Sequence, residues 1–143
     1  MADPLVVHAD IVLFLTGWYR TFLDGRDEAV CRDVLVTDHE PLPGEEWPEK
    51  MVVIRDDGGY DTSLLTAECT VGMNILAGTK EDPVDADDLA RIVHAARSQI
   101  PAVDPGNPVT AVLGSTRPVA VREAQPRARR YLSLTLGVAG SLL

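Results

Sequence analysis

Few residues in this chain could support nucleophilic or metal chemistry, and their spacing matches no catalytic motif. His8, His39 and His94 fall in a predicted helix, a loop and a second helix, without HxxxH or CxxC spacing. Ser115 lacks the Gly-x-Ser-x-Gly context that exposes a nucleophile on a sharp turn. We therefore predict no catalytic, cofactor-binding or metal-binding residues, and we expect a protein that is not an enzyme.

Two further stretches resemble ligand-binding loops only superficially. The glycines of GMNILAGTK, residues 72–80, are one residue too far apart for a phosphate loop, and the first half of the segment has a strand pattern. A calcium loop that started at Asp85 would place Ala90 and Ala96 where a glycine and a glutamate are needed. We interpret the aspartates of residues 82–88 as the negatively charged start of a helix.

The most regular pattern lies between Leu65 and Ala77, where seven apolar residues alternate with six others. A period of two over this length predicts a half-buried strand, roughly 40 Å long at about 3.3 Å per residue. Such a strand is about twice the usual length. We expect this strand to form the backbone of a sheet, and another segment or a partner must cover the other face or the edge of that sheet. The apolar positions are Leu65, Ala67, Cys69, Val71, Met73, Ile75 and Ala77.

Two helices are predicted around this strand. The first extends from Asp3 or Pro4 to Leu23, and the second follows Asp85, which we expect to be its N-cap. Helical spacing predicts the core face of each helix. These faces consist of Val7, Ile11, Phe14, Leu15, Trp18 and Phe22 in the first, and Leu89, Ile92, Val93, Ala96 and Ile100 in the second.

The remaining strands complete a sheet. We predict a turn at Asp56–Asp61 (DDGGYD) that joins a strand at 51–55 to the long strand as an antiparallel hairpin, and we expect 131–138 to pair beside the long strand. The order of elements predicts an α+β domain, a mainly antiparallel sheet with two helices packed on one face. We expect one domain spanning residues 1–143. Further strands are predicted at 31–37, 109–113 and 118–123.

The segment Asp38–Glu49 (DHEPLPGEEWPE) is rich in proline and acidic residues, so we predict a loop. Trp47 in this loop has two interpretations. It could anchor a partner protein, or it could fold back onto its own sheet. Trp18, in contrast, is expected in the core.

The charge is uneven along the chain. The net charge is −9, with −12 on residues 1–100 and +3 on residues 101–143. An acidic chain is unsuited to gripping nucleic acid, because tight phosphate binding needs clustered Lys and Arg. We expect neither export by the usual route nor a membrane span, since no apolar run approaches the ~20 residues required. Cys31 and Cys69 are expected to be reduced core thiols in predicted strands.

Five arginines gather within fourteen residues near the end of the chain. They could protect a solvated strand edge. Alternatively, they could meet the acidic loops of a neighbouring copy, which would give a head-to-tail ring. They are Arg117, Arg122, Arg127, Arg129 and Arg130.

The whole pattern resembles the tail terminator proteins of long-tailed bacteriophages. The resemblance is carried by the N-terminal apolar helix, VVIRDDGG at 52–59, LTAECTVGMNILA at 65–77, DADDLARIVHAARSQI at 85–100 and RARRYLSLTLGV at 127–138. It implies a structural virion protein of the tail or neck, assembled in the host bacterial cytoplasm. The acidic loop at 40–50 is longer than the resemblance leads us to expect, so its role does not follow from it.

The resemblance further implies a homohexameric ring that ends polymerisation of the tail tube. Its partners would be the major tail tube protein and the head-completion or stopper protein, and DNA would pass through its lumen without specific binding. We expect the loops at 38–50 and 56–64 to form ring, lumen or docking surfaces. The predicted interface residues are Trp47, Asp56, Asp57, Tyr60, Arg127, Arg129 and Arg130.

Two other classes remain open. The first is a different component of the phage neck, which would more often have a β-barrel pattern or a helical bundle. The second is a small cytoplasmic ligand-binding or enzymatic α+β domain, which predicts a monomer or dimer with a concave apolar pocket.

Overall fold

The computed structural model describes residues 5–143. It contains two helices, α1 (Ile11–Asp24) and α2 (Val84–Ala95), and two short 3-10 helices, η1 (Ala29–Cys31) and η2 (Ala96–Gln99). The strands are β1 (Val6–Val7), β2 (Leu35–Thr37), β3 (Lys50–Asp61), β4 (Thr66–Ala77), β5 (Val109–Ser115), β6 (Val119–Val121), β7 (Ala128–Ala139) and β8 (Ser141–Leu142).

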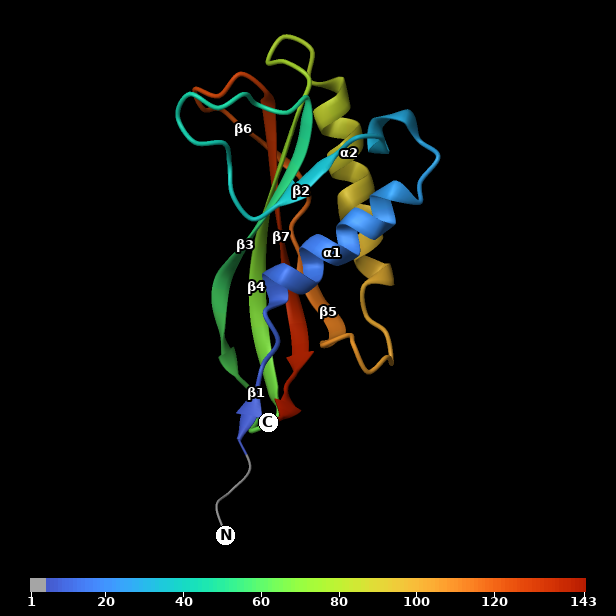
Figure 1. Cartoon of the computed structure of the whole chain (residues 1–143), viewed down its shortest axis with the longest axis vertical. Helices are drawn as coiled ribbons and strands as arrows, with labels where there is room; N and C mark the ends of the chain where they lie inside the picture. The colour runs from blue at the N-terminus through green and yellow to red at the C-terminus, as the bar shows by residue number, and fades with distance from the viewer. Residues whose placement is uncertain (1–4) are drawn as a thin grey trace.

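One large sheet organises the molecule. Its strand order is β2-β3-β4-β7-β5, β6 also pairs with β7, and a separate pair joins β1 to β8. Every pairing is antiparallel except that of β2 with β3. Both helices pack on the same side of the large sheet (Figure 1). The α+β prediction, with two helices on one face, is therefore confirmed, as are the antiparallel hairpin and the pairing of the last long strand with β4.

The alternation of the long strand is confirmed for its core face, but the strand starts at Thr66, so Leu65 lies outside it and is exposed, and residues 71–77 are buried on both faces. Val71, Met73 and Ile75 are fully buried beneath the helices, where they contact α1, α2 and the facing side chains of β7. Val71 lies opposite Leu134, and Met73 lies opposite Leu132. Alternating apolar side chains on two neighbouring strands thus form one continuous core layer.

The first helix starts later than predicted, and its buried face overlaps the predicted one only in part, at Ile11 and Leu15. Asp10 caps it, because its carboxylate accepts a hydrogen bond from the Leu13 backbone N–H at 3.1 Å. Val7 lies in β1 instead, and the predicted start at residues 3–4 lies outside the described residues. The buried side chains are Ile11, Leu15, Thr16, Tyr19 and Leu23, whereas Phe14, Trp18 and Phe22 pack half-buried at the margin of the core.

Tyr19 explains this rotation of the helix. Its hydroxyl donates to the Val93 carbonyl oxygen of α2 at 2.9 Å, so the ring is drawn between the two helices. Burial raises the pKa of Tyr19 above its usual value. A buried tyrosine with a satisfied hydroxyl is as suitable for a core as phenylalanine, and this allows the adjacent aromatic residues to remain at the margin.

Three other predicted boundaries are wrong. The predicted strand at 31–37 is strand only at β2, because η1 and a left-handed Asp33 (φ 54°) precede it, and Cys31 lies in η1. The predicted turn at 56–61 is strand, and the chain reverses at 62–65 instead. The N-cap of α2 is Pro83, with Asp85 in the first turn. Ile92 of its expected core face is only half-buried.

A β-bulge explains why the segment at 56–61 continues as a strand. The register with β4 shifts between Asp56 and Gly59. Asp56 pairs with Val71 and Gly59 with Cys69, so β3 contains one extra residue and the ladder continues beyond it. Gly58 adopts φ +91°, a conformation that L side chains rarely adopt. The two glycines that suggested a turn are therefore used by a bulge inside a longer strand.

Candidate functional site on the outer sheet face

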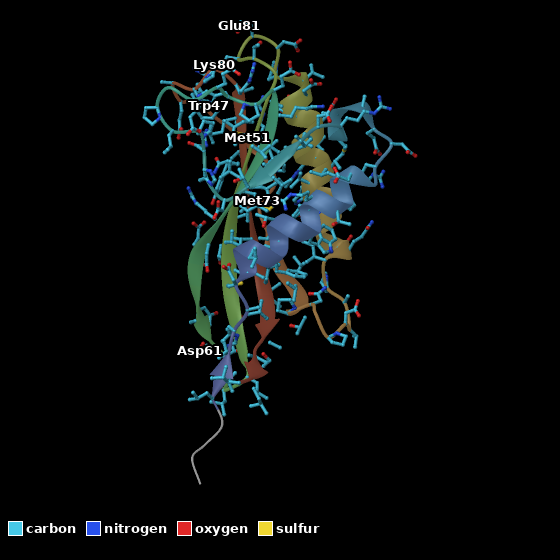
Figure 2. All side chains as sticks on the ribbon, in the orientation of Figure 1. Trp47, Met51, Asp61, Met73, Lys80 and Glu81 are labelled. Atoms are coloured by element: carbon cyan, nitrogen blue, oxygen red, sulfur yellow. The ribbon has the colours of Figure 1, made fainter. Side chains whose placement is uncertain are left out.

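The face of the large sheet opposite the two helices, here called the outer face, divides into two halves. Its covered half lies under the loop at 38–49, where Met51, Val53 and Leu76 form a small buried cluster with Trp47. Trp47 and Met51 lie at the end of the molecule opposite Asp61 (Figure 2). Of the two interpretations of Trp47, the structure thus has the one in which it packs against its own sheet.

Two of the predicted interface arginines hold this loop. Arg127 donates to the backbone oxygens of Pro48, at 3.1 Å, and Trp47, at 3.4 Å. Arg129 forms an ion pair with Glu40 and a longer one, at 3.5 Å, with Glu123. Arg129 is only 6% exposed, so its guanidinium interacts mainly with these two glutamates of the same chain. The loop is fixed at both ends, whereas residues 42–46 between them are exposed.

The third predicted arginine lies on the opposite face of the sheet. The Arg130 Nε donates to Asp87 Oδ1 at 2.6 Å, which connects β7 to the first turn of α2. All three arginines therefore have partners within the chain. Their contribution to contacts between neighbouring copies stays a prediction.

The open half of the outer face carries a polar cluster centred on Gly72. Arg55 Nε donates to Asp57 Oδ1 at 2.8 Å, and its guanidinium lies 5.4 Å from the centre of the Tyr131 ring. The Tyr131 hydroxyl donates to Asp57 Oδ2 at 3.4 Å. A Cβ atom at Gly72 would approach all three side chains within 2.7–3.0 Å, so the absence of a side chain at this position makes room for the cluster.

Further along the open half, polar side chains pair across strands. Tyr60 donates its hydroxyl to Glu68 at 2.6 Å, and Thr70 lies 3.4 Å from Thr135. The Glu68 carboxylate raises the pKa of Tyr60, because it accepts a hydrogen bond from the protonated hydroxyl. Predicted interface residues Asp57 and Tyr60 thus belong to the open half.

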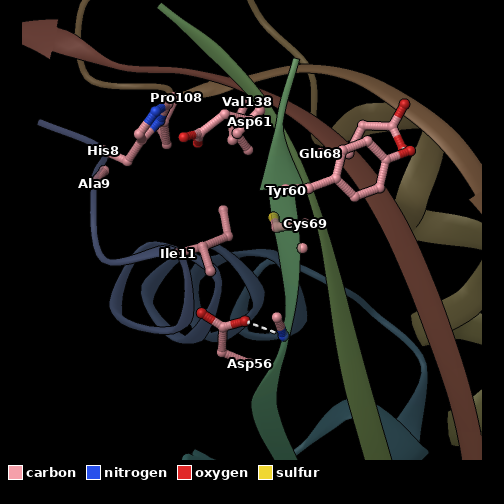
Figure 3. Close-up of a pocket in the computed structure, with 13 residues that line it drawn as sticks. His8, Ala9, Ile11, Asp56, Tyr60, Asp61, Glu68, Cys69, Pro108 and Val138 are labelled. Atoms are coloured by element: carbon pink, nitrogen blue, oxygen red, sulfur yellow. Dashed lines mark hydrogen bonds between the residues drawn. The ribbon is translucent and has the colours of Figure 1, made fainter. Parts of the chain in front are cut away.

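Asp56 lies on the other side of β3, beside a hollow of about 200 Å³ (Figure 3). Its carboxylate accepts from the Gly58 backbone N–H at 2.7 Å. The hollow lies between the connection from β1 to α1 and the end of the β3–β4 hairpin, with Ile11 and Cys69 in its wall. The buried Nδ1 of His8, also in this wall, has no hydrogen-bond partner among residues 5–143. Burial and the nearby Asp56 raise the Cys69 pKa to about 11.

One pair that the sequence analysis did not predict resembles a catalytic dyad. His94 Nε2 lies 3.3 Å from Ser115 Oγ, and Arg97 Nη1 lies 3.4 Å from His94 Nδ1. A guanidinium can only donate, so Nδ1 accepts and Nε2 carries the proton that is shared with Ser115. Partial burial, Arg97 and Arg117 lower the pKa of His94. A general base that activates a serine needs an unprotonated Nε2 to accept the hydroxyl proton, whereas here Nε2 is the donor.

Among residues 5–143, no group of three or more His, Cys, Asp or Glu side chains is arranged to hold a metal ion. Both cysteines are free thiols, with Cys31 buried and Cys69 half-buried. In the part of the chain that the structure describes, no helix combines the length and the apolar character of a membrane span.

Comparison with known proteins gives no assignment. No family model matches the chain, and no curated protein matches it. The resemblance to tail terminators therefore stays a prediction.

The sequence analysis missed most of the residues that build the outer face. Arg55, Gly72 and Tyr131 form the polar cluster, and Glu40 is the partner of Arg129. The sequence does contain an indication that the loop at 38–49 covers part of the outer face. Met51, Val53 and Leu76 occupy the positions of β3 and β4 that alternate with the core, and apolar residues there indicate that this face is buried too.

Proposed function

We propose that this protein is a structural virion component, a tail terminator that forms a ring at the end of a phage tail tube and joins the tail to the head-completion protein. The observation that carries the proposal is a sheet with two unlike open edges. At one edge, β2 pairs only with residues 51–53 of β3. At the other, β5 ends the sheet.

Unlike edges favour one kind of assembly. If one edge of a copy binds the other edge of the next copy, the contact is heterologous, and repeated contacts of this type close into a ring or extend as a filament. An isologous dimer would use the same edge twice and leave the other edge free. A ring is the form that a tail terminator requires.

The open half of the outer face suits a lumen through which DNA passes. Arg55, a cation on β3 in this half, forms an ion pair with Asp57. Two further side-chain pairs join the Tyr60 hydroxyl to the Glu68 carboxylate and the Thr70 hydroxyl to the Thr135 hydroxyl. DNA binding depends on free cations that displace counterions from phosphates. A face with its cation neutralised therefore gives DNA no site at which to stop.

The loop at 38–49 suits contact with a neighbouring ring or tube. Its ends are held by Arg127 and Arg129, whereas Leu42 is 65% exposed between them. Glu45 and Glu46 follow it at the exposed tip. A loop fixed at both ends loses less conformational entropy on binding than a free one.

The test is the mass and shape of the purified protein, alone and mixed with the tail tube protein of the same phage, by light scattering and negative-stain microscopy. We expect hexameric rings, or rings that cap tube ends. Rings that bind the head-completion protein and leave tube ends free would indicate a different neck component. A monomer or dimer that ignores tubes, and whose melting temperature rises with a metabolite, would overturn the proposal in favour of a ligand-binding domain.

A further inference from the structure

We infer that copies of this chain bind each other through two specific edges of opposite charge. This inference rests on the proposed ring. The acidic edge is the part of β3 beyond residue 53 together with the residue that follows β2, and the basic edge is β5, β6 and the connection between them. The partner of the acidic edge is the basic edge of a second copy.

The acidic edge consists of backbone without a strand neighbour and of exposed aspartates. The pairing of β2 ends at Thr37, which lies opposite Val53, so residues 54–61 have no strand on that side in the described chain. Asp38 follows directly on β2 and is exposed, and its Oδ1 lies 2.8 Å from Nδ1 of the adjacent His39. Asp56 and Asp61 are exposed on β3, and neither forms an ion pair among residues 5–143.

The basic edge carries the two arginines of the C-terminal cluster that the fold leaves free. Arg117 lies between β5 and β6, and Arg122 follows β6; both are exposed and unpaired within residues 5–143. Arg97 is a further cation near this edge, because its Nη1 lies 3.4 Å from Nδ1 of His94, and Nε2 of His94 lies 3.3 Å from Ser115 Oγ on β5. In contrast, Arg127, Arg129 and Arg130 are occupied by partners in the same chain.

Apolar side chains accompany these charges. Leu113 on β5 and Val119 on β6 are 52% and 55% exposed. Beside the acidic edge lies the hollow of about 200 Å³ with Ile11 and Cys69 in its wall. A leucine or valine from the basic edge of a neighbour would find apolar surface there, so charge can orient the contact and burial can stabilise it.

The bulge in β3 sets the character of the contact. Between Asp56 and Gly59 the strand departs from regular register, which limits how long a backbone ladder a second strand could form. Bulges and charged residues on edges prevent indiscriminate strand addition. Side-chain charge must therefore provide much of the selectivity, and two acidic edges repel each other. This repulsion disfavours the symmetrical pairing that would give a dimer.

The test uses two double charge reversals. Variant A, Arg117→Glu with Arg122→Glu, has two acidic edges, and variant B, Asp38→Lys with Asp61→Lys, has two basic edges. We expect each variant alone to self-associate at least about tenfold more weakly than the wild type, and an equimolar mixture to recover association, measured by sedimentation at low salt. Raising the salt to ~0.5 M should weaken both wild-type and mixed association.

Matched controls carry the same charge changes elsewhere. Arg32→Glu with Arg91→Glu controls variant A, and Glu81→Lys with Asp82→Lys controls variant B; all four residues are exposed. Glu81 and Asp61 lie at opposite ends of the molecule (Figure 2). The controls should associate like the wild type, and circular dichroism should confirm that all variants are folded.

The outcomes separate this inference from the proposed function. If the wild type forms rings and variants A and B form them equally well, the edges are wrong while the ring proposal stands. If A and B stay apart when mixed, the edge contact is also overturned, whether or not the wild type caps tubes. Association that is restored only in the mixture establishes the contact, and capping of tube ends is then judged separately.

Discussion

The two halves of the outer face are built from the same three strands, β3, β4 and β7, yet they have opposite character. In the covered half, Met51 and Leu76 are fully buried beneath the loop that carries Trp47. In the open half, the same side of the same strands carries Arg55, Thr70 and other polar residues. The difference shows that residue types on the face away from the helices indicate whether another segment covers it: apolar residues where it is covered, polar residues where it is open.

Truncating one residue in each half should give the largest contrast. Leu76→Ala should lower the free energy of unfolding by about 3 kcal/mol, because it leaves a cavity between the sheet and the loop. Thr70→Ala, six positions earlier on the same face of β4, should cost about 0.5 kcal/mol, since this half faces solvent. Urea denaturation measures both values. Equal losses would show that the two halves do not differ in packing.

Removing the cover itself should give a smaller effect than the cavity beneath it. Trp47→Ala should cost about 2 kcal/mol, less than a fully buried tryptophan, because Trp47 is half-buried. Hydrogen exchange should become faster in the loop at 38–49 and at Met51 and Val53, whereas the open half should be unchanged. Leu42→Ala at the exposed tip of the loop is the control and should leave stability within about 0.5 kcal/mol.

The ion pair that holds the loop should contribute less again. Arg129→Met keeps most of the buried stem and removes the charge, leaving Glu40 and Glu123 without their partner. Both glutamates reach solvent, so they can rehydrate, and we expect a loss of about 1–2 kcal/mol, below the ~3–5 kcal/mol of a fully buried broken pair. The double variant that adds Glu40→Gln should recover part of the loss. If it recovers nothing, the arginine acts through packing alone.

This contrast also explains how far the sequence could predict the fold. Period-two alternation identified β4 and β7 and their pairing, because both strands bury one face along most of their length. It did not give the length of β3, because Asp-Gly-Gly is typical of a turn, and only the register with β4 shows that these residues form a bulge. The start of α1 was missed because apolar residues of β1 continue the helical pattern.

The candidate site was predictable only in part. Trp47 and the arginines were conspicuous by type, but the partners of Arg127 lie 79 and 80 positions away along the chain. Spacing along the sequence cannot identify such partners. The burial of Arg129 likewise depends on a loop and a strand that meet only after folding. Arg117 and Arg122, which have no ion-pair partner in the described part of the chain, could be distinguished from the other three arginines only by these contacts.

The smallest effect concerns the margin between the two faces, where Cys69 borders the hollow beside the open half. Burial, with Asp56 nearby, raises its pKa from 9.0 to about 11. Between these values the unfolded chain releases the thiol proton and the folded chain retains it. The free energy of unfolding must therefore fall as pH rises through this window, and the stabilisation is fully present below pH 9.

Replacing the thiol tests this directly. Cys69→Ala should flatten the dependence of the urea midpoint on pH between 9 and 10, measured with a reductant present, below the range where Tyr19 contributes. Cys31→Ala is the comparison variant, because Cys31 lies in η1, away from the hollow. Burial also raises the pKa of Cys31, so this variant should lose only the part of the slope that Cys31 causes and keep the contribution of Cys69. If the urea midpoint of both variants depends on pH as in the wild type, the Cys69 thiol has an ordinary pKa. The hollow would then be open to water, like the open half of the outer face.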